Sequence, residues 1–308
     1  TNDIASDGYY MIALSEKKQS FFVGLRSTFY RLAMITGQGL IVILAGFLEQ
    51  RLGDPARAWS VTMVFTAFLM LLLTVGNFFA TPVYEENRSA EGGQGIVQVL
   101  RDFFLKPGIG WAIAFILSYR LGESQLVKMA APFLLDTDSA GGLDYSTEAV
   151  GTIYGTLGVV FLSAGGILGG ILISRDGLKK WMLPMLLALN LPNLLYALLA
   201  WTGEKSLWAV SGTVILEQFG YGFGFAAFLI YLIYISQGPY KTAHYALATG
   251  FMALGMMLPG MASGFIQESL GYPGFFLWVV AAALPSLILL KYIRYPRDFG
   301  KKSAENDV

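Results

Sequence analysis

Charged side chains occur inside apolar segments of this sequence, where a charge is costly. The segment 109–135 carries Tyr119, Arg120, Glu123, Gln125 and Lys128 near its middle. An ionisable group in hydrocarbon costs about 2.5–3.5 kcal/mol on insertion scales, so each one requires a partner or an aqueous cavity. Arg120 and Glu123 are three residues apart and can pair on one face of a helix. A buried carboxylate near a cation can also carry a proton when its pKa is shifted toward neutrality.

Polar groups recur in three further apolar segments. They are Glu217 and Gln218 in the segment 208–236, Arg31 in the segment 28–48, and Asp3 and Asp7 on one face of 1–14. Interhelical ion pairs that only fix packing would explain any single one of these residues. Acids and bases from at least four helices at similar depth instead predict a polar cavity near the middle of the bilayer, where transporters bind substrates and coupling ions.

The composition excludes several other kinds of chemistry. The 308 residues are 55% hydrophobic and 14% charged, whereas soluble domains carry about 25% charged residues, so this is a membrane protein. Lys+Arg and Asp+Glu number 21 each, which argues against a nucleic-acid partner. The sequence has no cysteine and one histidine, and it lacks hydrolase, kinase and dinucleotide-binding motifs. We expect no enzyme activity, no cofactor and no metal site.

Apolar runs of about 20 residues, the length that crosses a bilayer, predict an all-α polytopic protein. Eight runs occur, at 28–48, 59–80, 109–135, 151–173, 181–201, 208–236, 244–267 and 274–293, and 1–14 resembles the latter part of a ninth helix. A long polar segment separates the first two from the last six. We therefore expect the remainder of an N-terminal helical bundle over 1–80, a central loop over 81–107, a six-helix bundle over 108–293 and a tail over 294–308.

The loop charges predict the orientation, because loops rich in Lys and Arg stay in the cytoplasm. When alternate loops are counted together, one side carries 15 Lys and Arg residues and the other carries 3. The asymmetry makes 81–107 and 294–308 cytoplasmic, and it requires 1–14 to count as a span. Two six-helix halves with about three N-terminal helices absent would explain this pattern, and such a fragment is not expected to transport.

One predicted cytoplasmic connection resembles a motif of a known family. The sequence GGILISRDGLKKW at 169–181 is similar to the Gly-x3-Asp-Arg-x-Gly-Arg-Arg loop of the major facilitator superfamily. Gly170, Arg175, Gly177 and Lys179 occupy matching positions. Ser174 replaces the aspartate of the motif and Asp176 follows two positions later, so the usual cytoplasmic-gate salt bridge has no acid at its normal position.

Within that superfamily the sequence resembles the AmpG-type muropeptide permeases, whose relatives include acetyl-CoA transporters. The resemblance is carried by TNDIASDGYYMIAL (1–14), FYRLAMITGQGL (29–40), SYRLGES (118–124), LEQFGYGFGFAAF (216–228), YKTAHYALATGFMALG (240–255) and GYPGFFLWVVAAALPSLILL (271–290). It implies the major facilitator fold, with helices 4–12 of 12 present. It also implies proton-driven import of anhydro-muropeptides across an inner membrane for cell-wall recycling. The cavity residues that it implies are Asp3, Asp7, Tyr9, Arg31, Tyr119, Arg120, Glu123 and Glu217.

The residues leave the substrate and the coupling group open. A carrier for another peptide, a sugar or a coenzyme-type anion, or a receptor that does not transport, remains an alternative. The expected partners are a small anionic substrate, protons and the lipid bilayer, and the expected state is a monomer. We predict that Arg31, Arg120 and Lys128 include the groups that hold substrate carboxylates, because arginine can grip a carboxylate with two parallel hydrogen bonds. Asp7 or Glu217 is the predicted proton carrier, with Glu123 paired to Arg120.

Overall fold

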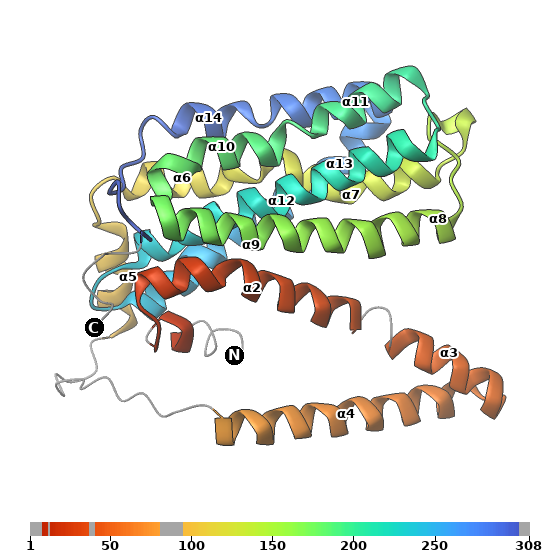
Figure 1. Cartoon of the computed structure of the whole chain (residues 1–308), viewed down its shortest axis with the longest axis horizontal. Coiled ribbons are helices and arrows are strands. Elements are labelled where there is room, and N and C mark those ends of the chain that lie inside the picture. Colours follow the sequence, from red (N-terminus) through yellow and green to blue (C-terminus); the bar gives the residue numbers. More distant parts are fainter. Residues whose placement is uncertain (1–7, 12, 37–40, 81–94, 302–308) are drawn as a thin grey trace. The chain divides into compact units, whose positions relative to one another are not determined.

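The computed structural model describes residues 8–11, 13–36, 41–80 and 95–301, and every regular element among them is a helix (Figure 1). The helices are α2 (Glu16–Ile35), α3 (Ile41–Leu52), α4 (Pro55–Ala80), α5 (Ile96–Phe104), α6 (Ile109–Tyr119), α7 (Leu121–Leu135), α8 (Thr147–Thr152), α9 (Val159–Asp176), α10 (Leu178–Asn190), α11 (Asn193–Thr202), α12 (Leu207–Ser236), α13 (Lys241–Ala281) and α14 (Leu284–Leu289). A short 3-10 helix, η2 (Asp138–Ala140), and a π-helix, η3 (Ile153–Gly158), complete the set. The all-α prediction therefore holds for the described part of the chain.

The chain forms two compact units, residues 28–89 and residues 1–27 together with 90–308. In the smaller unit α3 packs against α4. Their connection turns at Gly53, whose φ of +67° favours glycine. The Asp54 carboxylate then accepts a hydrogen bond from the Ala56 backbone N–H at 2.9 Å and so caps the start of α4. The predicted boundaries at 80, 107 and 293 stay predictions, and 81–94 lies outside the described residues.

Helix α12 is the centre of the larger unit. It packs against α9, α10 and α13, while α7 and α11 pack against α13 (Figure 1). Most α12 side chains between Val210 and Ser236 are buried. Apolar residues occur on all of its sides, as expected of a helix surrounded by other helices, and Glu217 and Gln218 are polar exceptions.

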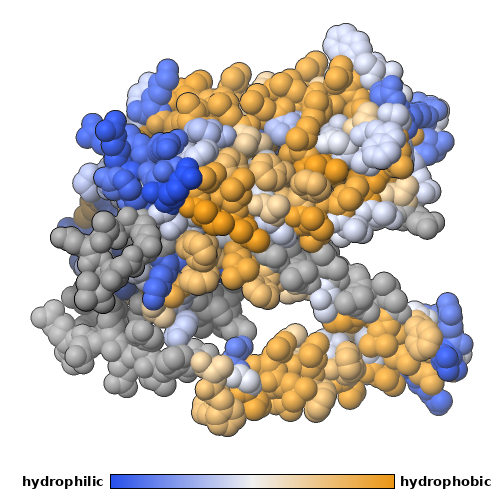
Figure 2. Space-filling model, viewed as in Figure 1, coloured by the Kyte–Doolittle hydropathy of each residue, from blue (hydrophilic) through white to orange (hydrophobic). Residues whose placement is uncertain are grey.

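Within the described residues, five helical segments are long and apolar enough to cross a membrane: Pro55–Ala80, Ala149–Asp176, Leu178–Thr202, Leu207–Ser236 and Lys241–Leu289. The last contains two predicted runs, because Gly271 with φ 64° and ψ 172° interrupts the helix between 244–267 and 274–293. Hydrophobic residues cover the sides of the larger unit and hydrophilic residues gather at its two ends (Figure 2). A multi-pass membrane protein explains this distribution.

One predicted run is not continuous in the structure, and another has different bounds. The run 109–135 is broken at Arg120, whose φ of −109° and ψ of 18° lie outside helical values, so α6 and α7 are separate helices. The run 28–48 contains the end of α2 and the start of α3, and α2 begins earlier, at Glu16. Apolarity predicts where a chain can cross a bilayer but not where the helix breaks within the crossing.

Glycines bring α12 close to its neighbours, as the small-x3-small pairs predict. A Cβ atom at Gly220 would lie 1.9 Å from the Ala188 carbonyl oxygen of α10, and one at Gly165 would lie 2.2 Å from the Phe219 carbonyl oxygen. Gly264 differs, because a Cβ atom there would have no neighbour within 4 Å. Glycine is therefore required for packing at the first two positions and not at the third.

We expect Gly220→Ala to lower the stability of the purified protein by about 1–3 kcal/mol, because overpacking displaces backbone that cannot move away easily. The matched control is Gly212→Ala on the same helix, where the new methyl group would meet no atom within 4 Å. Thermal unfolding in detergent measures the difference. Equal unfolding midpoints for the two variants would contradict the close approach of α10 and α12.

Candidate functional site

The break at Arg120 places a charged residue at the centre of the helical bundle. Helix α6 ends at Tyr119 and α7 begins at Leu121, so Arg120 occupies the junction between them. Gly122 allows α7 to approach the segment after Gly271, since a Cβ atom there would lie 2.5 Å from the Val279 carbonyl oxygen. This contact holds the junction in the interior, where Arg120 is 5% exposed.

The Arg120 guanidinium has two polar partners on two different helices. Its Nε donates to Glu123 Oε2 at 2.8 Å, which confirms the predicted ion pair three residues apart. Its Nη2 donates to the Tyr221 hydroxyl oxygen of α12, also at 2.8 Å. Glu123 is 1% exposed, so both charges lie in the interior of the larger unit. Removing one partner would leave the other as a buried, uncompensated charge.

Aromatic rings enclose this ion pair. The guanidinium carbon of Arg120 lies 5.2 Å from the Tyr221 ring centroid and 4.9 Å from that of Phe225, within the range of cation–π attraction. On the other side of the junction the Tyr119 ring stacks on Phe228 with the centroids 4.4 Å apart. The Tyr119 hydroxyl donates to the Gly224 carbonyl oxygen at 2.8 Å. Tyr119, one of the predicted cavity residues, therefore joins α6 to α12 beside Arg120.

The Arg120–Glu123 ion pair contains hydrogen-bond donors and an acceptor that are not used in the described structure. Glu123 Oε1 is buried and has no hydrogen-bond partner among the described residues. The two bonds of Arg120 use two of the five N–H donors of a guanidinium. A buried polar atom without a partner costs free energy that a hydrogen bond from a ligand or a proton would relieve. The pair is thus equipped to bind a further polar group.

Glu217 lies one turn before Tyr221 on the same face of α12, and it is 2% exposed. Its carboxylate oxygens accept hydrogen bonds from Gln218 Nε2 at 2.8 and 3.1 Å. It is also close enough to Tyr154 and Tyr196 to interact with them electrostatically, and these two hydroxyl groups share a hydrogen bond. Tyr154 belongs to the π-helix η3, and π-helical turns are frequent at functional sites.

The other predicted site residues lie in different surroundings. Gln125 Oε1 accepts a hydrogen bond from Trp278 Nε1 at 2.9 Å, so this amide joins α7 to α13 and does not contact Arg120. Lys128 is exposed and Tyr9 is half-buried. Asp3, Asp7 and the side chain of Arg31 lie outside the described residues. The structure thus brings Tyr119, Arg120 and Glu123 together with α12, while Gln125 and Lys128 lie apart from this ion pair.

Three tyrosines of these two clusters were not singled out from the sequence. Tyr221 follows Glu217 by four residues, the spacing that places two side chains on one helix face, and that signal was available. Tyr154 and Tyr196 are single hydroxyl groups on different helices, and no sequence pattern connects them. Asn193 is fully buried, and neither of its side-chain polar atoms bonds to a residue in the described part of the chain, which makes it a further polar residue of the bundle interior.

The loop motif lies at the turn between α9 and α10. Gly177 adopts φ +88° there, and a Cβ atom at this position would lie 2.5 Å from the Arg297 carbonyl oxygen. Asp176 accepts hydrogen bonds from Arg175, Lys180 and Trp181 at 2.9–3.0 Å. Lys179 is exposed and Gly170 is buried against the Ser20 carbonyl oxygen. The displaced acid therefore forms its ion pairs within the loop itself.

Several known proteins with a related sequence are named as permeases or transporters. The anhydromuropeptide permease of Escherichia coli (strain K12) is 26% identical over 299 residues, which are 97% of this chain and 58% of that protein. A protein of Rickettsia conorii is named as transporter AmpG 4. It is 24% identical over 305 residues, which are 95% of this chain and 69% of that protein. No protein-family model matches the chain. The predicted resemblance to AmpG-type permeases is confirmed, and the chain spans little more than half the length of the Escherichia coli relative.

Proposed function

We propose that the chain is part of a secondary active transporter that imports anhydro-muropeptides together with protons across a bacterial inner membrane. The observation that carries the proposal is the buried Arg120–Glu123 pair, which contacts Tyr221 of a second helix inside an apolar bundle. The similarity to an anhydromuropeptide permease over 97% of the chain supports the substrate class. The major facilitator fold, with helices 4–12 present, and a monomeric state belong to the same proposal.

Substrate binding is assigned to Arg120. A muropeptide carries carboxylates, and a guanidinium can hold a carboxylate with two parallel hydrogen bonds. In the described structure Glu123 occupies one edge of the guanidinium and Tyr221 bonds another donor. A substrate carboxylate would bond the remaining donors or replace the Tyr221 hydroxyl. Replacement of the hydroxyl would break the bond between Arg120 and α12 and so connect binding to movement of the bundle helices.

Proton coupling is assigned to Glu217. It has no cation within four residues on its own helix, whereas Glu123 forms an ion pair with Arg120 at 2.8 Å. The hydroxyl groups of Tyr154 and Tyr196 lie close enough to the Glu217 carboxylate to interact with it electrostatically, and a hydroxyl group can donate a hydrogen bond to a carboxylate or accept one from a protonated carboxyl group. Glu217 and Tyr221 share a face of α12, so a change at the carboxylate is one turn away from the Arg120 contact.

The orientation follows from the loop charges and is tested by labelling. Cysteine is absent from the chain, so Ala140→Cys and Arg297→Cys each create one thiol, and both positions are exposed. With the 294–308 tail in the cytoplasm, an impermeant thiol reagent added to intact cells should label position 140 and not position 297. Labelling of both positions in permeabilised cells is the control. Labelling of position 297 alone in intact cells would show that the chain has the opposite orientation.

The transport function is tested with the full-length protein in proteoliposomes. We expect uptake of a radiolabelled anhydro-muropeptide when the outside is acidic, and loss of accumulation when a protonophore removes the gradient. A receptor would bind the same ligand with no dependence on the gradient. A carrier for another peptide, a sugar or a coenzyme-type anion would leave the label outside and accumulate one of those compounds instead. Either result would replace the proposed activity.

A further inference from the structure

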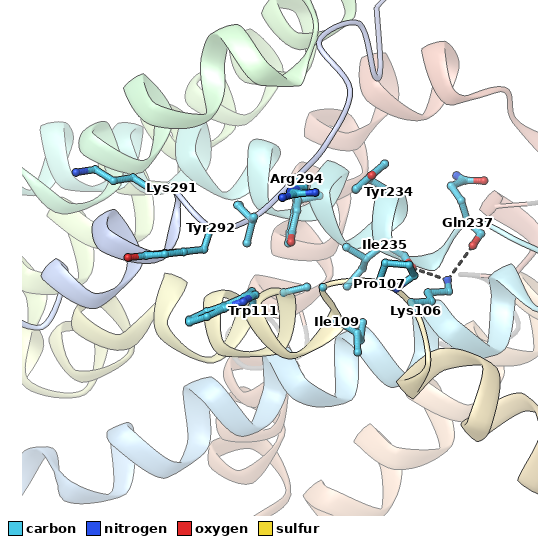
Figure 3. Close-up of a pocket in the computed structure, with 14 residues that line it drawn as sticks. Lys106, Pro107, Ile109, Trp111, Tyr234, Ile235, Gln237, Lys291, Tyr292 and Arg294 are labelled. Atoms are coloured by element: carbon cyan, nitrogen blue, oxygen red, sulfur yellow. Dashed lines mark hydrogen bonds between the residues drawn. The ribbon is translucent and has the colours of Figure 1, made fainter.

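A cavity of about 760 Å³ lies at one end of the larger unit, away from the Arg120 pair. The start of α6, the end of α12 and the segment after α14 form its walls (Figure 3). Three of its lining residues are cationic, namely Lys106, Lys291 and Arg294, and none is acidic. The cavity therefore presents positive charge at a surface where the bundle helices end.

Two of these cations are not neutralised within the described structure. Lys291 and Arg294 are exposed, and neither has a hydrogen-bond or ion-pair partner among the residues described. In Figure 3 Arg294 lies between Tyr292 and Tyr234, whereas the Lys291 side chain extends outward at the rim. Unpaired cations that line a cavity favour an anionic occupant.

Lys106 adds a preorganised donor. Its ammonium donates to the Ile235 and Gln237 carbonyl oxygens at 2.7 and 2.8 Å, at the end of α12 (Figure 3). An ammonium has three N–H donors, so one of them has no described partner. Burial lowers the pKa of Lys106, and the Asp102 carboxylate opposes this shift. An anion in the cavity would favour the charged form of this lysine.

Exposed apolar side chains continue from the cavity rim. Trp111 stacks on Tyr292 with the ring centroids 4.8 Å apart, and the two side chains are about half exposed. On α14, Leu284 and Ile288 are 55% and 57% exposed. Helix α14 belongs to the apolar segment Lys241–Leu289, which is long enough to cross a membrane, so its exposed apolar side chains face acyl chains. Trp and Tyr at such a position are typical of the level of the lipid headgroups.

We propose that this cavity binds the phosphodiester headgroup of an anionic phospholipid from the surrounding bilayer. The phosphate contacts Arg294 and the remaining N–H of Lys106, Lys291 contacts the outer part of the headgroup, and the acyl chains lie along α6 and α14. Basic cavities between transmembrane helices bind anionic lipid headgroups in this way. The exposed apolar side chains of Trp111, Leu284 and Ile288 favour a lipid over a soluble phosphate compound, which would leave them without an apolar partner.

The test measures lipid retention by native mass spectrometry of the purified, delipidated chain titrated with phosphatidylglycerol or phosphatidylcholine. We expect preferential retention of phosphatidylglycerol, and a loss of affinity of about fivefold in Arg294→Gln and more in the double variant Lys291→Gln/Arg294→Gln. The matched control is Arg297→Gln, an exposed cation three residues away that does not line the cavity. This control should retain phosphatidylglycerol as the unchanged protein does.

Thermal unfolding in phosphatidylcholine nanodiscs shows whether the variants fold, and their midpoints should equal that of the unchanged chain. Added phosphatidylglycerol should raise the midpoint of the unchanged chain and not that of the double variant. Equal retention of the two lipids, or an equal loss in Arg297→Gln, would overturn the site. If glycerol 3-phosphate raises the unfolding midpoint as much as phosphatidylglycerol does, the occupant is a soluble phosphate ligand and the proposed phospholipid is wrong.

Discussion

Arg120→Gln should abolish uptake of an anionic muropeptide by the full-length protein, and Arg120→Lys should raise the KM by about 10–100-fold. Lysine keeps the charge but loses the planar fork that holds a carboxylate with two bonds. Hydrogen bonds to charged groups contribute about 1.5–3 kcal/mol each, and 1.4 kcal/mol corresponds to tenfold in affinity. Initial rates of radiolabelled substrate uptake over a range of concentrations measure both values.

The folding control uses the partner of Arg120. Removing the guanidinium alone leaves Glu123 as a buried carboxylate without its cation, which costs about 3–5 kcal/mol. The double variant Arg120→Gln/Glu123→Gln has no unpaired charge and should recover the thermal stability that Arg120→Gln loses. It should not recover uptake. If the Lys and Gln variants both keep the KM of the unchanged protein, Arg120 has a packing role and the proposed substrate contact is wrong.

Much of this architecture could be predicted from the sequence because one signal, the length of apolar runs, is strong in membrane proteins. The runs at 59–80, 151–173, 181–201 and 208–236 each lie within one helical segment long enough to cross the membrane. The local pair Arg120–Glu123 could also be predicted, because a spacing of three residues on a helix decides the contact by itself.

Contacts between distant residues could not be predicted in the same way. The bond from Arg120 to Tyr221 joins residues 101 positions apart, and it depends on how α12 is rotated against the junction of α6 and α7. Gln125 is two positions after Glu123, so its side chain points in another direction and contacts Trp278. A lone polar residue in an apolar run indicates that it has a partner somewhere. The rotation and depth of its helix decide which partner that is.

Glu217→Gln should abolish accumulation of substrate driven by a pH gradient while counterflow exchange of preloaded substrate continues, because exchange requires no net proton movement. The glutamine keeps the shape of the side chain and its hydrogen-bond contact with Gln218 but cannot be ionised. Glu217→Asp, which keeps a titratable carboxyl, should retain part of the accumulation, and Gln218→Ala, which leaves the carboxylate in place, should retain most of it. Tyr154→Phe and Tyr196→Phe remove the hydroxyl groups near Glu217 and should slow accumulation without abolishing it.

Proteoliposomes with an imposed pH gradient measure accumulation, and the same vesicles without a gradient measure exchange. If Glu217→Gln accumulates substrate at the rate of the unchanged protein, the coupling carboxylate is another acid, Asp7 or Glu123 being next in order, and the assignment to α12 is wrong.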